Sequence, residues 1–74
     1  MRYAVIIESA PGGCSAYVPD LPGCIAAGST VEETERLVQE AIEFHLEGMR
    51  LHGEAIPAPT TYCSYVTVPA DPAA

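Results

Sequence analysis

Lysine is missing from this sequence, and arginine occurs only three times among 74 residues. Ten carboxylates against these three arginines give a formal net charge of −7. Phosphate backbones and anionic lipid surfaces are bound through clusters of Lys and Arg. The composition therefore argues against direct binding of nucleic acid or of an anionic membrane. An acidic surface suits a basic protein partner, although excess acid also serves simply to keep a small apolar protein in solution.

Long apolar runs are lacking too, because the short run after Arg2 ends at Glu8. A membrane span needs roughly 18 apolar residues, and no signal peptide is recognisable. The three cysteines, Cys14, Cys24 and Cys63, are an odd number and match neither CxxC nor a zinc-ligand spacing. We therefore expect a cytoplasmic protein that holds no metal and no cofactor.

What the sequence does contain is apolar side chains, which make up 49% of its residues. A chain this short forms one domain and buries only about 60% of the surface that its unfolded form exposes. Small apolar domains often complete their core by pairing with copies of themselves. We expect a single domain over residues 1–69, a disordered tail over 70–74, and a homo-oligomer, either a dimer or a tetramer.

Four segments have the composition of β-strands, rich in β-branched and aromatic residues or alternating in polarity. They are residues 2–9, 14–18, 24–28 and 60–69. In the first, Tyr3, Val5 and Ile7 fall on one face and Ala4 and Ile6 on the other, so we expect a central strand that is covered on both sides.

A helix is predicted between the third and fourth strands. Thr30 followed by Glu33 forms a capping box at its start, and Gly53 with Pro57 beyond it ends the helix. Helical periodicity predicts one apolar stripe, which consists of Val31, Thr34, Val38, Ala41, Ile42, His45, Leu46 and Met49. The predicted fold is α+β with the order β-β-β-α-β, a three- or four-stranded mainly antiparallel sheet with one helix packed on it.

Gly48 is unusual inside this helix, because glycine there costs roughly 1 kcal/mol relative to alanine. We expect compensation from the close approach of another backbone, either within the subunit or across a dimer.

Catalytic residues are few. His45 lies on the apolar stripe and His52 in the last helical turn, where an imidazole suits the helix dipole. A nucleophile paired with a base is not supported by any motif around them. Seven of the ten acids lie between Glu32 and Glu54, and Asp71 lies in the tail. Only Glu8 and Asp20 are left at strand ends, too few to hold two metal ions. We expect no enzymatic activity.

The segment "YVPDLPGC" follows the second strand. Asp20 can accept hydrogen bonds from backbone N–H groups, Pro22 fixes φ, and Gly23 accepts a positive φ. Leu21, between two prolines, has few places to bury its side chain, so it is a candidate anchor for a partner. A rigid corner is the favoured interpretation, and a binding loop is the alternative.

The residues "YVPDLPGCIAAGSTVEETERLVQEAIEFHLEGMRLHGEAIPAPT" together resemble the HicB family of antitoxins. The shared features are the PDLPGC corner, the capping box, an acidic helix that ends in glycine, and the I-P-A-P segment. The resemblance covers about residues 3–61 and implies a degraded ribonuclease-H-like fold without its catalytic acids.

The resemblance also implies a partner, a small basic HicA-type ribonuclease that cleaves messenger RNA and is blocked by its antitoxin. By this analogy we place the partner surface on Tyr17, Asp20, Leu21, Pro22 and Gly23, with complementary charge from the outward helix acids. Many family members carry a C-terminal DNA-binding domain. This sequence stops at Ala74, so we expect no direct nucleic-acid binding.

Two other functions stay open. One is an orphan oligomeric scaffold or ligand-binding domain of the same family without a toxin partner. The other is a residual hydrolase that uses Glu8, Asp20 and a histidine.

Overall fold

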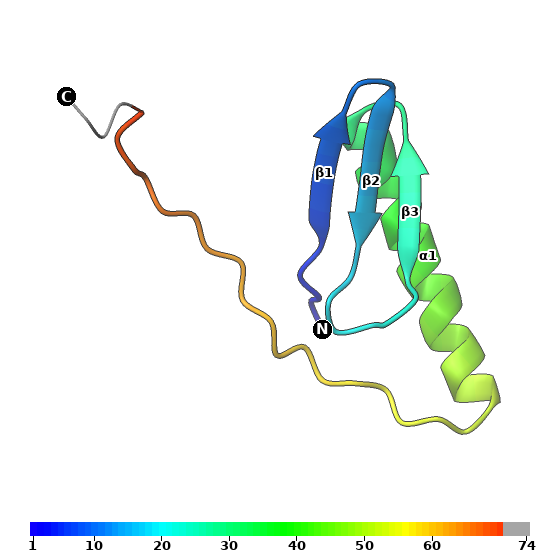
Figure 1. Ribbon diagram of the computed structural model, residues 1–74. Helices are drawn as coiled ribbons and strands as arrows, with labels where there is room; N and C mark the ends of the chain where they lie inside the picture. The colour runs from blue at the N-terminus through cyan, green and yellow to red at the C-terminus, as the bar shows by residue number, and fades with distance from the viewer. Residues whose placement is uncertain (71–74) are drawn as a thin grey trace.

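The computed structural model describes residues 1–70 and consists of three strands followed by one long helix. The elements are β1 (Ile6–Ala10), β2 (Gly13–Tyr17), β3 (Ile25–Gly28) and α1 (Val31–Leu51). The strands form an antiparallel sheet in the order β1-β2-β3, and α1 lies behind it in Figure 1. The predicted α+β fold is thus confirmed through the helix. Most of the tail expected over residues 70–74 lies outside the described residues.

The strand register determines which side chains face the helix. Ile7 pairs with Ala16, and Ala16 pairs with Ala26, and these three pack toward α1. Since successive residues of a strand point to opposite faces, the next row, Ile6, Tyr17 and Ile25, lies on the face that α1 does not cover. We call this side the open face of the sheet.

The first strand differs from its prediction in position. Strand β1 is at the edge, with β2 as its one ladder neighbour among residues 1–70, so the expectation of a central strand is wrong. Tyr3, Val5 and Ile7 do share the helix-facing side as predicted. Apolar residues on both faces of a strand indicated two-sided burial, but Ile6 is only half-buried and Ala4 lies before the strand begins.

Both ends of α1 have the local structure that the sequence predicted. The Glu33 N–H donates to Thr30 Oγ1 at 3.1 Å, and the Glu33 carboxylate accepts from the Ser29 N–H at 2.7 Å. At the other end Gly53 has a φ of +70°, and the N–H groups of Gly53 and Glu54 donate to the carbonyls of Arg50 and Met49. This is a Schellman cap, in which a left-handed residue lets the chain satisfy the last carbonyls.

The core lies between the sheet and α1. Its buried members come from β2, the corner and the helix; they are Ala16, Val18, Leu21, Cys24, Val38 and Leu46, with Thr34 buried beside them. Thr34 is satisfied there, because its hydroxyl donates to the Thr30 carbonyl at 2.7 Å. The predicted apolar stripe is confirmed for most of its length, but Val31 at its start is 40% exposed.

Gly48 shows no close approach within the chain. A methyl group placed on its Cα would meet nothing within 4 Å. The intrasubunit half of the packing prediction is therefore wrong, and the half that invokes a second copy stays a prediction.

The fourth strand, predicted over residues 60–69, is not formed among the described residues. The segment is extended and exposed, and Figure 1 shows it (orange) leaving the body of the protein. Alternating polarity and β-propensity favour an extended backbone, but a strand also requires a neighbour to which it can hydrogen-bond. Within residues 1–70, no helix is long and apolar enough to cross a membrane.

Candidate protein-interaction site

The "YVPDLPGC" segment connects β2 to β3 and is closed by its own backbone. The N–H groups of Leu21 and Cys24 donate to the carbonyls of Val18 and Leu21, each at 3.0 Å, and the Val18 N–H donates to the Cys24 carbonyl at 3.2 Å. Gly23 has a φ of +84°, which favours glycine. These bonds make the segment the rigid corner that the sequence predicted.

Leu21 lies inside the protein, with 1% of its surface exposed. Its side chain belongs to the core cluster together with Val18 and Cys24. The expectation that Leu21 has few places to bury its side chain is therefore wrong, because the corner folds the residue back under the sheet. In this conformation Leu21 stabilises the corner and offers no side-chain surface to a partner.

Asp20 holds the C-terminal segment. Its carboxylate accepts four hydrogen bonds, from the N–H groups of Thr60 and Thr61 at 3.1 Å and from their hydroxyls at 3.0 Å. The N–H of Thr61 contributes most to lowering the pKa of Asp20 below its ordinary value of 3.8, while partial burial opposes this change. A second attachment lies nearby, where the Tyr3 hydroxyl donates to the Pro57 carbonyl.

Three of the five predicted partner-binding residues are exposed: Tyr17, Pro22 and Gly23. Tyr17 lies on the open face between Ile6 and Ile25, and the side chains of Tyr17 and Ile25 are 44% and 69% exposed. A shallow, mainly apolar hollow there is lined by Ser15, Tyr17, Ile25 and Ala27, among others. Whether these residues bind a partner stays a prediction. Ile6 and Ile25 were not among the predicted partner-binding residues, although the alternation of residues 24–28 places Ile25 on the face opposite the buried Cys24.

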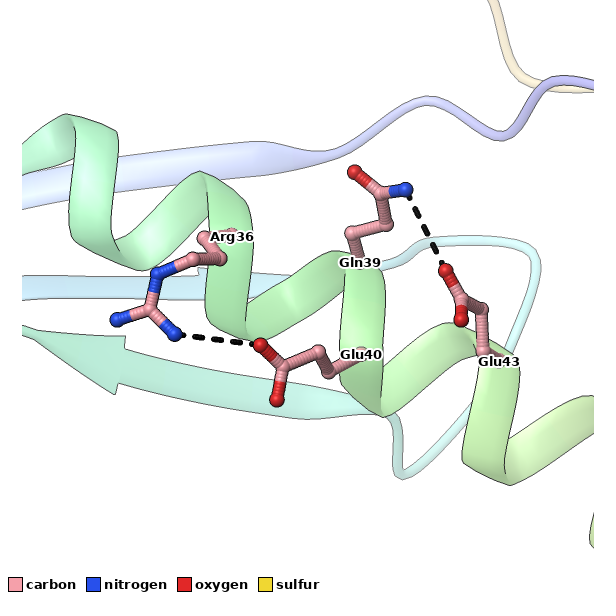
Figure 2. A network of polar contacts seen from close by, with 4 residues as sticks. All are labelled: Arg36, Gln39, Glu40 and Glu43. Atoms are coloured by element: carbon pink, nitrogen blue, oxygen red, sulfur yellow. Dashed lines mark hydrogen bonds and ion pairs between the residues drawn. The ribbon is translucent and has the colours of Figure 1, made fainter.

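The helix acids lie on another side of the molecule. Arg36 pairs with Glu40 at 3.2 Å, and the Gln39 side chain donates to Glu43 at 3.3 Å. Figure 2 shows both contacts along α1. Arg36 and Glu40 are both more than half exposed, so this ion pair adds little stability. Because α1 lies behind the sheet in Figure 1, these helix side chains and the open face lie on opposite sides of the sheet.

The groups that could carry catalysis are occupied or dispersed. Burial raises the pKa of the Cys24 thiol, which disfavours the thiolate that a nucleophile requires. His52 Nδ1 donates to the Gly48 carbonyl at 2.7 Å. Within residues 1–70, no group of three or more His, Cys, Asp or Glu side chains is arranged to hold a metal ion.

Comparisons with known proteins agree with this fold. Residues 3–71 match the family model of the HicB-like antitoxin of bacterial toxin–antitoxin systems. Among solved structures, a chain of the HicA3 and HicB3 toxin–antitoxin complex superposes with a TM-score of 0.70 and 30% sequence identity. The superposition covers 81% of this chain and 70% of that chain.

Curated relatives extend the similarity. A 14.9 kDa protein of Haemophilus phage HP1, encoded in the rep-hol intergenic region, is 39% identical over 69 residues. The match covers 93% of this chain, which thus spans about half (52%) of the phage protein. A UPF0150 protein of Thermoplasma acidophilum is 40% identical over 58 residues, 77% of this chain and 84% of that protein. The chain belongs to the family of HicB-like antitoxins of bacterial toxin–antitoxin systems.

Proposed function

We propose that this chain is a non-enzymatic antitoxin module that binds and inhibits a small, basic, HicA-type toxin that cleaves messenger RNA. The observation that carries the proposal is the fold match to a chain of a toxin–antitoxin complex, at 30% identity over 81% of this chain. The net charge of −7 supports it, since a ribonuclease surface that binds RNA is basic and attracts an acidic inhibitor.

The proposed contact surface is the open face next to the corner. Ile6, Tyr17 and Ile25 form an apolar row there, and the exposed Pro22 and Gly23 lie on the neighbouring corner. Tyrosine at the centre of such a row is a side chain on which binding energy often concentrates. Asp20 and Leu21 keep a supporting role, since the carboxylate is bound to Thr60 and Thr61 and the leucine is in the core.

The experiment is a pull-down of the tagged chain from its native cells, washed at low and then at high salt. The expected product is a small basic protein in fixed proportion, whose cleavage of RNA stops when the antitoxin is added. Tyr17→Ala should then weaken the complex by about tenfold or more, the usual effect of losing a central tyrosine. The matched control is Phe44→Ala, an 82% exposed side chain on α1 that should leave affinity unchanged.

An orphan oligomeric scaffold of the same family is the alternative function. Recovery of the tagged chain only with copies of itself would favour this alternative. A toxin complex that Tyr17→Ala leaves unaffected and Phe44→Ala weakens would instead place the contact surface on the helix.

A further inference from the structure

Glu8 is the one acid in the three strands, and the register places it on the open face. Glu8 pairs with Ser15, and Ser15 pairs with Ala27. Side chains two residues apart on a strand share a face, so this row is the neighbour of the apolar row that contains Tyr17 and Ile25. A single negative charge therefore lies beside the surface that we propose for partner binding.

The Glu8 carboxylate has no partner within residues 1–70. It takes part in neither the side-chain hydrogen bonds nor the ion pair found there. Of the three arginines, Arg36 and Arg50 lie on α1, behind the sheet in Figure 1, and Arg2 precedes strand β1. Covering a carboxylate with a partner is costly unless the partner supplies a cation. The open face therefore calls for a positive group next to its apolar row.

A shallow hollow of about 300 Å³ lies beside the turn between β1 and β2, and Glu8 lines it. We call it the Glu8 hollow. Its other walls carry small side chains, among them Gly13, Ser15 and Ala27. The apolar hollow beside Tyr17, of about 500 Å³, shares Ser15 and Ala27 with it. The two hollows thus adjoin, and one has a carboxylate at its side where the other has an aromatic ring.

We propose that the Glu8 hollow binds an arginine side chain of the basic partner, while a neighbouring apolar side chain of that partner enters the hollow beside Tyr17. This inference rests on the proposed function and names the chemical group that the open face recognises. Glu8 thereby differs from the acids of α1, because it touches the partner instead of attracting it from a distance.

The lining of the hollow suits a guanidinium group. A carboxylate can accept two parallel N–H bonds from a guanidinium, which the ammonium of lysine cannot provide. The Ser15 hydroxyl, across the ladder from Glu8, can accept a further one. The small side chains at Gly13 and Ala27 leave room for the aliphatic stem of arginine to lie flat on the sheet. Arginine is also enriched at protein interfaces, whereas lysine is depleted there.

The first test uses this protein alone with two capped dipeptides, acetyl-leucyl-arginine amide and its neutral citrulline counterpart. In NMR titrations at low salt, the arginine peptide should produce saturable shifts at the amides of Gly13, Ser15 and Ala27. The citrulline peptide should bind about fivefold more weakly or worse, because a charge-assisted hydrogen bond is lost. Glu8→Gln should abolish the difference between the two peptides.

The Glu8 variant should stay folded, because the side chain is exposed and has no partner in the chain. Circular dichroism checks this expectation. The matched control is Glu54→Gln, which removes the same charge from an exposed side chain beyond the end of α1. This control should bind the arginine peptide as the parent does.

The second test uses the toxin complex from the pull-down. Glu8→Gln should accelerate dissociation by about tenfold and change association little, because the contact is direct. The effect should persist at high salt, since a covered ion pair is screened less than an exposed one. Glu8→Asp keeps the charge but shortens its reach, so its dissociation rate should lie between those of the parent and Glu8→Gln.

Three results would each overturn the proposal: arginine and citrulline peptides that bind alike or not at all, shifts spread equally over α1, or a toxin complex whose dissociation does not respond to Glu8→Gln. Failure to recover a toxin would instead count against the proposed function. The peptide titration would still decide whether the Glu8 hollow binds arginine, so the two failures are distinguishable.

Discussion

At the scale of single residues, two adjacent positions of the corner, Asp20 and Leu21, have different structural roles. Leu21 points inward and anchors the corner to the core, whereas Asp20 points outward and holds the chain 40 residues later. Neighbouring residues thus connect the corner to two distant parts of the molecule. The two can be tested separately, because one contribution is apolar and the other depends on charge.

For Asp20 we predict a dependence on pH. Its folded-state pKa lies below the ordinary value of 3.8, chiefly through the N–H of Thr61. The carboxylate therefore stabilises the attachment of Thr60 and Thr61 above the unfolded-state pKa, and this stabilisation is lost as the pH falls through the folded-state pKa. In an NMR titration, the amide signals of Thr60 and Thr61 should shift with a midpoint below 3.8. Asp20→Asn should abolish this titration, and a midpoint at or above 3.8 in the parent would contradict the prediction.

For Leu21 we predict a large loss of stability on truncation. Leu21→Ala removes a 1% exposed side chain from the core and should lower the free energy of unfolding by about 2–5 kcal/mol. Urea unfolding followed by circular dichroism measures this change. The neighbouring Pro22 is exposed, so Pro22→Ala is the control and should cost far less. Equal effects of the two variants would mean that the corner is stabilised by its backbone shape and not by burial of the leucine.

At the scale of elements, the local signals and the antiparallel sheet were predictable, but the edge position of β1 and the absence of a partner for residues 60–69 among residues 1–70 were not. The capping box at Thr30 and the glycine cap at Gly53 involve residues close in sequence, so the bounds of α1 followed from the chain itself. Strand β1 and residues 60–69 were both identified as extended, but whether such a segment has two sheet neighbours, one or none depends on contacts across the fold. The burial of Leu21 was not predicted for the same reason. Turn chemistry predicts a corner but not which of its side chains the fold will cover.

Gly48 gives the helix a prediction of its own. The space next to its Cα is open within the chain, so an added methyl group meets no obstacle. Gly48→Ala should therefore raise the free energy of unfolding of the single subunit by about 1 kcal/mol, the difference in helix propensity. Thermal unfolding at low protein concentration measures it, with the molar mass determined in parallel. A destabilised variant, or one with altered mass, would mean that a second molecule approaches the helix at Gly48.

At the scale of the whole molecule, charge and apolar surface are distributed to different faces. The acids gather along α1, while the exposed apolar row of Ile6, Tyr17 and Ile25 lies on the open face beyond the sheet. A partner whose contacts are confined to the open face does not touch the helix acids, because α1 lies behind the sheet. If the proposed function is right, the acids determine how fast a basic toxin arrives, and the apolar row determines how long it stays.

This separation can be measured with Glu32, Glu35 and Glu47, which are exposed on α1. Changing all three to glutamine reduces the net charge from −7 to −4. At low salt the association rate with the toxin should fall by about threefold to tenfold, because electrostatic steering weakens, and the dissociation rate should not change. Surface plasmon resonance gives both rates, and at high salt the variant and the parent should converge because salt screens the field. Tyr17→Ala should show the opposite pattern, with faster dissociation and unchanged association. If the triple variant accelerated dissociation instead, the helix would be in contact with the toxin, and the open face could no longer be the whole interface.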